Sequence, residues 1–261
     1  MVPRVELLGR GLLVCFLVSA VCLNAAQLKE ARVTHVVKDV KLLPPLAAPR
    51  SVLLSDSVRD GDAIRTGPAS RGELTLPDQT IVRLGAKTIV TFSEGARAMN
   101  LDEGAMLFQI PRSAAGAKIK TAAIAIVSTG ATGIVERHAG FYVKLLVLEG
   151  TVRCYLANRI GESLLVQPGQ ILITKPDVTA LPDPAHFDIA EVMKTCLLVR
   201  EFQPLLSQHL IESEEQKQLT LIGSGKYIPS NLVIFGRGTL VSVVNPTPRQ
   251  SSKLPEGSTG N

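Results

Sequence analysis

Few residues in this 261-residue chain have the types and spacing that metal chemistry requires. Asp60 and Asp62 flank Gly61 and could suggest a calcium site, but calcium takes six or more oxygen ligands and no comparable acidic cluster lies nearby in the sequence. A turn-forming pair of aspartates is the better interpretation. The histidines stand apart and show no HxH or HExxH spacing: His35, His138, His186 and His209. The sequence therefore predicts no metal site.

Motifs for catalysis or phosphate binding are also missing from the sequence. There is no GxSxG, Walker or GxGxxG pattern. The nearest glycine-rich candidate, Gly223-Ser224-Gly225, lacks a third glycine and a clear following helix, which favours a linker. We therefore expect no catalytic residue, no cofactor and no enzyme. An envelope hydrolase, the alternative, would need a deep pocket with paired carboxylates or a Ser–His pair.

The composition narrows the kinds of partner. The formal charge of +5 and the pI of about 9.1 come from scattered Lys and Arg residues, which favours a solvated surface over nucleic-acid binding. The chain has no Trp, three Tyr and seven Phe, and this scarcity counts against an aromatic platform for sugars or bases. A hydrophobic fraction of 46% still predicts a substantial core.

The N-terminus has the order of a secretory signal peptide. Arg4 and Arg10 precede an apolar run over residues 11–21, and small residues follow up to Ala26. We predict a signal peptide over 1–26, with cleavage after Ala26, and a periplasmic or secreted protein. Two alternatives stay open: an uncleaved run that anchors the chain in the inner membrane, and a lipoprotein modified at Cys22.

Two cysteines would remain after that cleavage, Cys154 and Cys196. In an oxidising compartment they could form a disulfide, which would constrain the unfolded chain by roughly 4 kcal/mol. The alternative is a pair of free buried thiols, because Cys154 alternates with apolar residues of one strand and Cys196 lies on the apolar side of a helix.

Short apolar segments recur about every ten residues over 31–175, separated by turn residues, and no long amphipathic segment precedes residue 185. This pattern predicts a mainly β domain, either a short-stranded solenoid or roll or a sandwich. The expected strands are 31–43 with a break, 51–58, 63–66, 73–76, 81–84, 88–92, two within 98–110, then 118–127, 141–148 with 151–157 as its hairpin partner, 163–166 and 171–174.

The composition changes after residue 175. Residues 176–244 predict a small appendage with a helix over 187–202, for which Asp183 can be the N-cap, and a second helix within 205–221. Ser213 fits a capping box but could equally lie inside that second helix. The apolar stripe of the first helix packs on the β-domain or docks a partner. A strand pair over 231–244 and a disordered tail over 245–261 complete the expectation.

The β segment resembles the FecR domain, the periplasmic domain of the iron-dicitrate sensor and its relatives. The matching motifs run from about residue 58 to residue 174 and lie in the family's order. Their signature residues are Gly61, Asp62, Thr66, Gly67, Asp78, Gly85, Gly104, Gly130, Glu149, Gly150 and Gly169.

This resemblance implies a β-rich domain that is not an enzyme and that, in the sensors, relays a signal from an outer-membrane transporter to a sigma factor. Three features differ from the sensors: only ten residues precede the apolar run, Gln79 stands where glycine is usual, and Ala131 stands where threonine is common. Our interpretation is an exported binding or scaffold module whose partner is an envelope protein or glycan, with membrane contact only if the apolar run is retained. A sensor acting through a separate membrane protein is the alternative.

Overall fold

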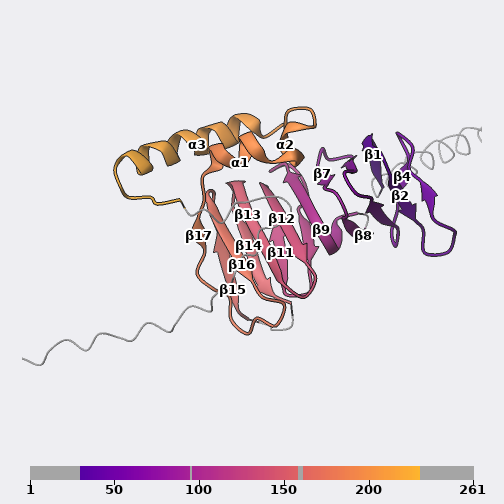
Figure 1. Ribbon diagram of the computed structural model, residues 1–261, viewed down its shortest axis with the longest axis horizontal. Coiled ribbons are helices and arrows are strands. Elements are labelled where there is room, and N and C mark those ends of the chain that lie inside the picture. Colours follow the sequence, from indigo (N-terminus) through magenta and orange to yellow (C-terminus); the bar gives the residue numbers. More distant parts are fainter. Residues whose placement is uncertain (1–29, 95, 158–160, 230–261) are drawn as a thin grey trace, which may run out of the picture.

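The computed structural model describes residues 30–94, 96–157 and 161–229, which form seventeen strands followed by three helices (Figure 1). The expected signal segment, the strand pair over 231–244 and the C-terminal tail lie outside these residues. Within the described residues, no helix has the length and apolar character needed to span a membrane. The mainly β prediction is confirmed.

Hydrogen bonds link all seventeen strands into one sheet, which folds into two layers at the long strand β9 (Ala98–Ile110). The helix-side layer runs in the order β4 (Ser57–Val58), β1 (Ala31–Val37), β6 (Arg71–Thr75), β7 (Ile81–Leu84), the second half of β9, β12 (Ala131–His138), β13 (Tyr142–Gly150), β16 (Gln170–Thr174) and β17 (Ala185–His186). The outer layer runs β3 (Arg50–Ser51), β2 (Val40–Leu43), β5 (Ala63–Thr66), β8 (Ile89–Ser93), the first half of β9, β10 (Ala117–Lys120), β11 (Ile124–Ser128), β14 (Val152–Leu156) and β15 (Ser163–Val166).

The passage of β9 between the layers depends on Gly104. Its φ is +92°, and a side chain there would approach the Cα of Thr88 to 2.6 Å. Only glycine satisfies both conditions without strain. The sequence predicted two strands around this glycine, whereas the structure has one strand whose halves pair in different layers.

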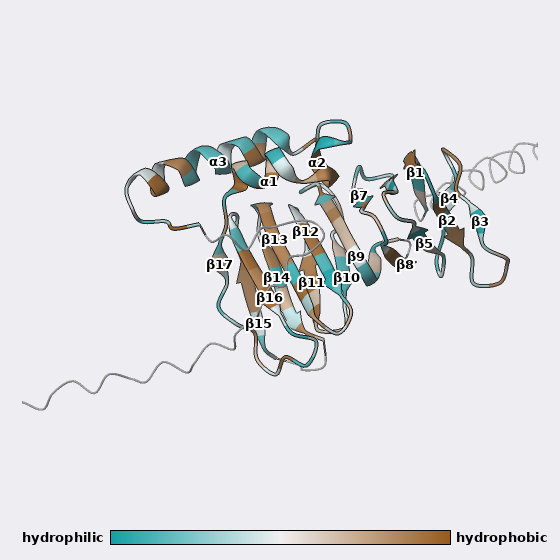
Figure 2. Ribbon diagram, viewed as in Figure 1, coloured by the Kyte–Doolittle hydropathy of each residue, from teal (hydrophilic) through white to brown (hydrophobic). Residues whose placement is uncertain are grey.

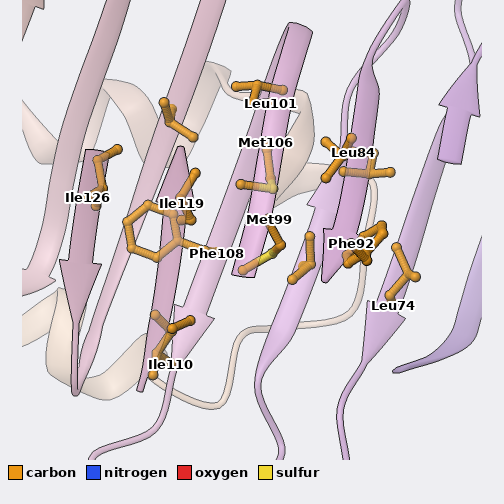
Figure 3. Packing of buried hydrophobic residues seen from close by; sticks show 14 of the residues in the cluster. Leu74, Leu84, Phe92, Met99, Leu101, Met106, Phe108, Ile110, Ile119 and Ile126 are labelled. Atoms are coloured by element: carbon orange, nitrogen blue, oxygen red, sulfur yellow. The ribbon is translucent and has the colours of Figure 1, made fainter. Parts of the chain in front are cut away.

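Two apolar cores follow from the alternation of side chains along the strands. The first fills the space between the layers, where Phe92 of β8 and Phe108 of β9 are fully buried (Figure 3). The second lies on the other face of the helix-side layer, where Leu146 of β13 meets Val192 and Phe187. Both faces of β13 are therefore covered, and Figure 2 shows its apolar character.

Three helices cover that second core: α1 (Ile189–Thr195), α2 (Leu197–Arg200) and α3 (Gln208–Gly223). The N-cap of α1 is Asp188, whose carboxylate accepts a hydrogen bond from the Glu191 amide at 3.2 Å. The predicted cap at Asp183 is therefore wrong, because β17 intervenes. The apolar stripe packs on the chain's own sheet, and Ser213 lies inside α3.

Several strand predictions differ from the structure. Segment 118–127 is two strands, because the Thr121 side chain closes a turn with Ile124. Strand β12 was not predicted. Strands β13 and β14 are not a hairpin, since β13 pairs with β12 and β16 while β14 pairs with β11 and β15. Within residues 60–92, β6 and β7 form a hairpin, whereas β5 pairs with β2 and β8 in the other layer.

Candidate functional site

The end of the β12–β13 hairpin brings several ionisable side chains into contact at the surface. Residues two apart on a strand share a face. Glu136 and His138 of β12 therefore project from the same face of the layer as Tyr142 and Lys144 of β13. Glu103, from the bend of β9, completes the group at its rim, with 3.7 Å between Glu103 Oε1 and His138 Nδ1. We call these five residues the hairpin cluster.

A buried ion pair forms the inner half of the hairpin cluster. The Nζ of Lys144 lies 2.5 Å from Oε2 of Glu136, and the lysine side chain is fully buried. Removing two charges from water is costly, and an excellent geometry is needed to offset that cost. The pair therefore fixes how the two strands present the residues beyond it.

His138 forms the outer half, and its side chain is half exposed. Its Nε2 lies 2.9 Å from Oε1 of Glu136, and this hydrogen bond raises the pKa of the imidazole above its ordinary value. Burial opposes ionisation of Glu136, but the hydrogen bond with His138 and the charge of Lys144 outweigh burial and keep the pKa of that carboxyl below its ordinary value. Both groups are thus biased toward their charged forms.

The aromatic rings at the hairpin end differ in exposure. Tyr142 is buried, and its ring centroid lies 4.9 Å from that of His138. Burial, followed by the nearby charge of Glu136, raises the pKa of Tyr142 well above its ordinary value. Phe141 is 66% exposed. The hairpin end therefore offers an exposed apolar ring on the turn that follows His138, a feature suited to contact with another molecule.

The bend of β9 holds the hairpin end in place. A carboxylate oxygen of Glu103 accepts a hydrogen bond from the Ala139 amide at 2.9 Å. Arg137 donates to the backbone carbonyls of Leu101 and Asp102. The turn that carries Phe141 is therefore tied to a neighbouring strand.

The contacts of His138 do not resemble a nucleophile–base pair. Within the described residues, its ring meets Glu136, Glu103 and Tyr142, which are two carboxylates and a phenol. A catalytic histidine of a hydrolase would instead meet a serine or cysteine. The arrangement can hold a proton and present a charged imidazole, which suits recognition.

A second polar group joins the β-sheet to the helices. Arg83 of β7, 1% exposed, donates to Glu73 Oε2 at 2.8 Å. Its other nitrogens donate to the carbonyls of Leu198 and Gln203, at 3.0 and 2.6 Å. One guanidinium thus satisfies carbonyls at the end of α2 and in the segment that follows, which would otherwise lack partners in the sheet–helix contact.

A third polar group lies where α3 begins. The Thr132 hydroxyl donates to Glu149 Oε1 at 2.8 Å and lies 2.7 Å from the hydroxyl of Ser207, the N-cap of α3. Glu149 is 3% exposed. Burial raises the pKa of its carboxyl, and the hydrogen bond from Thr132 only partly opposes that effect. Glu149 therefore occupies a buried contact between β13 and α3 and is removed from the surface.

The other signature residues are distributed over several turns and do not form one site. Thr66 donates to the Gly85 carbonyl and accepts from the Thr88 amide. Asp78 accepts from the Thr80 amide and pairs with Arg97 at 2.8 Å. Asp62 accepts from the Arg59 amide; positive φ values occur at Gly61, Gly104, Gly150 and Gly169. Each of these interactions fixes a local backbone conformation.

Both cysteines are free and buried, and they belong to different cores. Cys154 lies between the two sheet layers, where burial raises the pKa of its thiol to about 12. Cys196 lies between the sheet and the helices, where burial raises the thiol pKa to about 11. The structure thus corresponds to the free-thiol alternative and not to a disulfide.

The remaining candidates have structural contacts. The rings of His35 and Phe202 lie 5.3 Å apart, and those of His186 and Tyr227 lie 4.3 Å apart. Gly223-Ser224-Gly225 ends helix α3, the opposite end from one that would bind phosphate. Across residues 30–94, 96–157 and 161–229, no group of three or more His, Cys, Asp or Glu is placed to hold a metal ion.

Sequence reasoning missed the hairpin cluster and Arg83. It treated His138 as isolated, but the structure places it between Glu136 and Glu103. One signal was available: a lysine within the apolar run over 141–148 needs a buried partner.

Comparison with known proteins agrees with the resemblance that the motifs of the β segment indicated. A family model described as "FecR protein" matches residues 62–153. Two crystal structures of a "putative anti-sigma factor" from Parabacteroides distasonis ATCC 8503 are similar, each with 15% identity and a TM-score of 0.41 over 53% of this chain and 74% of that one. No curated protein matches the chain.

Proposed function

We propose that this FecR-domain protein is an exported, non-catalytic binding module of the bacterial envelope, and that it contacts a protein partner through the end of the β12–β13 hairpin. The observation that carries the proposal is the 66% exposure of Phe141 on the turn that follows His138, which Glu103 ties to β9 through the Ala139 amide. A preformed surface of this kind loses little conformational entropy on binding.

Two further features support this proposal. The signal-peptide pattern over residues 1–26 provides for export. Arg83 ties the helices to the sheet, so the domain and its helices can act as one scaffold. Glycan binding is the weaker alternative at this surface, because one exposed phenylalanine offers little stacking area for a sugar.

A pull-down from envelope fractions tests the proposal. The tagged full chain is compared with Phe141→Ser and with Leu165→Ser, a matched change at an exposed apolar residue of β15 in the outer layer. The wild type and Leu165→Ser should recover the same partner, and Phe141→Ser should not. Recovery of no partner, or equal recovery by all three chains, would contradict the proposal.

A second candidate is a periplasmic component of a transmembrane signalling system that regulates a sigma factor through a separate membrane partner. The FecR match over residues 62–153 favours it. This candidate predicts that deletion of the gene changes transcription of a specific operon under iron limitation. An unchanged transcriptome under that condition would exclude it and leave the binding proposal standing.

A further inference from the structure

One side of the outer layer carries cations without acidic side chains. Strands β10, β11, β14 and β15 contain Lys118, Lys120 and Arg153 but no aspartate or glutamate. Successive side chains of a strand point to opposite faces of the sheet. Because Ile119 and Cys154 point into the core between the layers, the three cations point away from that core. Cations from separate strands are thus brought to one face.

Two rows of three side chains follow from the register of β10, β11 and β14. Within a row, neighbours are cross-strand partners about 5 Å apart, and the two rows lie about 7 Å apart along the strands. The six side chains therefore form one contiguous surface. We call these residues the basic face: Lys120, Ala125 and Tyr155 form one row, and Lys118, Val127 and Arg153 form the other.

The three cations of the basic face form no ion pair with a carboxylate of residues 30–94, 96–157 or 161–229. Two acidic residues of adjoining segments have other partners. Asp102 of β9 accepts a hydrogen bond from Asn100 at 2.6 Å, and Glu162, which precedes β15, accepts one from the Leu181 amide at 2.9 Å. The positive charge of the basic face is therefore available to an anion from another molecule.

The middle of the basic face is lined by small side chains. Ala125 and Val127 of β11 are partly exposed. The longer side chains of Lys120 on β10 and Arg153 on β14 are exposed on either side of them. A chain molecule that lies along β11 can therefore contact Val127 while its anionic groups reach the lysines on one side and Arg153 on the other.

The spacing of the lysines suits an extended peptide. Lys118 and Lys120 are two residues apart on one strand, a separation of about 7 Å. Side chains on one edge of an extended peptide repeat at the same interval, so acidic residues at alternate positions would meet both lysines. Nucleic-acid bases and sugars would need more aromatic surface than Tyr155 offers. A lipid surface would need exposed large apolar side chains, which these six residues lack.

We propose that the basic face binds an extended acidic segment of a second protein partner, with carboxylates at alternate positions. The segment lies along β11. Its carboxylates on one edge pair with Lys118 and Lys120, and its other edge contacts Arg153 and Tyr155. This surface contains none of the hairpin residues, so its failure would leave the proposed function unaffected.

Fluorescence anisotropy of a labelled peptide tests the proposal. The probe is a short peptide in which glutamate alternates with threonine, and it is titrated with the full chain. Joint Lys118→Gln and Lys120→Gln substitution should raise the dissociation constant about fivefold or more, because two exposed ion pairs are lost. Arg153→Gln, on another strand, should also weaken binding. The control is joint Lys41→Gln and Arg65→Gln substitution, which removes the same charge from a cross-strand pair on β2 and β5 and should leave binding unchanged.

A second peptide separates the spacing of the carboxylates from their number. It has the same composition with its glutamates consecutive, and it should bind clearly more weakly than the alternating peptide. Equal urea midpoints for the variants and the wild type check that the fold is retained.

Four outcomes would overturn the proposal. The first is the absence of saturable binding of the alternating peptide. The second is an equal dissociation constant for the two double variants, and the third is equal binding of the two peptides, which would mean attraction by net charge alone. The fourth is tighter binding of a thymidine oligonucleotide or of phosphatidylglycerol vesicles than of the alternating peptide, which would assign the basic face to a different class of partner.

Discussion

The guanidinium carbon of Arg83 lies 4.8 Å from the centroid of the Phe202 ring. Arg83 belongs to β7 of the sheet, and Phe202 belongs to the segment after α2. This cation–π contact therefore joins the sheet to the helical region. The same guanidinium bonds to Glu73 and to two carbonyls of the helical region. This group of bonds makes the helices part of the β-domain.

Loss of this cation should destabilise the protein strongly. Arg83→Met removes the buried charge and leaves Glu73 and two carbonyls without their donor, which should lower the free energy of unfolding by about 3–5 kcal/mol. Urea unfolding measures the change. The control is Arg97→Met, which breaks the more exposed pair with Asp78 and should cost clearly less. Equal losses in the two variants would contradict the role given to Arg83.

The departure at Gln79 from the usual family glycine has a backbone consequence. Its φ is +67°, in the left-handed region that costs a residue with a side chain about 1–2 kcal/mol. Gln79→Gly should therefore stabilise the protein, by about 0.5–1 kcal/mol after the greater chain entropy of glycine is subtracted. Thermal unfolding and urea unfolding both measure this gain in stability.

A second glycine substitution is the matched control. Gln216 is an exposed residue inside α3. Gln216→Gly should lower stability by about 1 kcal/mol, because glycine is a poor helix former. A loss of stability in Gln79→Gly comparable to that in the control would show that the positive φ carries no strain.

His138 should make stability depend on pH. Its folded-state pKa is raised, so its contribution is fully present below the unfolded pKa of about 6.5 and is lost as the pH rises through the folded pKa. The facing groups are Glu136, Glu103, Tyr142 and Lys144. The stability difference between the wild type and His138→Gln should be largest at acidic pH and shrink toward alkaline pH.

A double-mutant cycle tests the cause of that dependence. In a Glu136→Gln background, the strongest partner of His138 is gone, and the pH-dependent part of the His138→Gln effect should largely disappear. Persistence of the full pH dependence in that background would assign it to other groups.

The contribution of Glu149 to stability should change with pH in the opposite direction to that of a carboxyl whose pKa is lowered by folding. Burial raises its folded-state pKa, so its contribution is fully present below the unfolded pKa and is lost as the pH rises through the folded value. Glu149→Gln keeps an acceptor for Thr132 but carries no charge, and should gain stability relative to the wild type as the pH rises from acid to neutral. Glu212→Gln, at an exposed position of α3, is the control. A growing loss in Glu149→Gln toward neutral pH would contradict this reading.

Local patterns predicted much of the fold. Strand alternation and turn residues were sufficient to predict β5 and β7 with their observed bounds and to predict a mainly β domain. Strand β12 was missed because Thr132, Gly133, Glu136 and Arg137 interrupt its apolar pattern. Both of its faces are nevertheless covered, and its hairpin pairing with β13 together with its pairing with β9 explains the strand.

The candidate site could not be predicted because its contacts join residues that lie on different elements of the fold. The distance between His138 and Glu103 depends on the bend of β9 at Gly104, and the Arg83 contacts join residues more than a hundred positions apart. Sequence spacing carries no information about such contacts. The free state of Cys154 and Cys196 likewise depends on which layer each one occupies.

Photocrosslinking at the hairpin end tests whether Phe141 contacts a protein partner. Benzoylphenylalanine replaces Phe141 in the full chain, with replacement of Leu165 as the control, and both chains are irradiated in intact cells. We expect a discrete adduct with one envelope protein from position 141, absent from position 165 and weakened by His138→Gln. No adduct from position 141, or the same adducts from both positions, would contradict it.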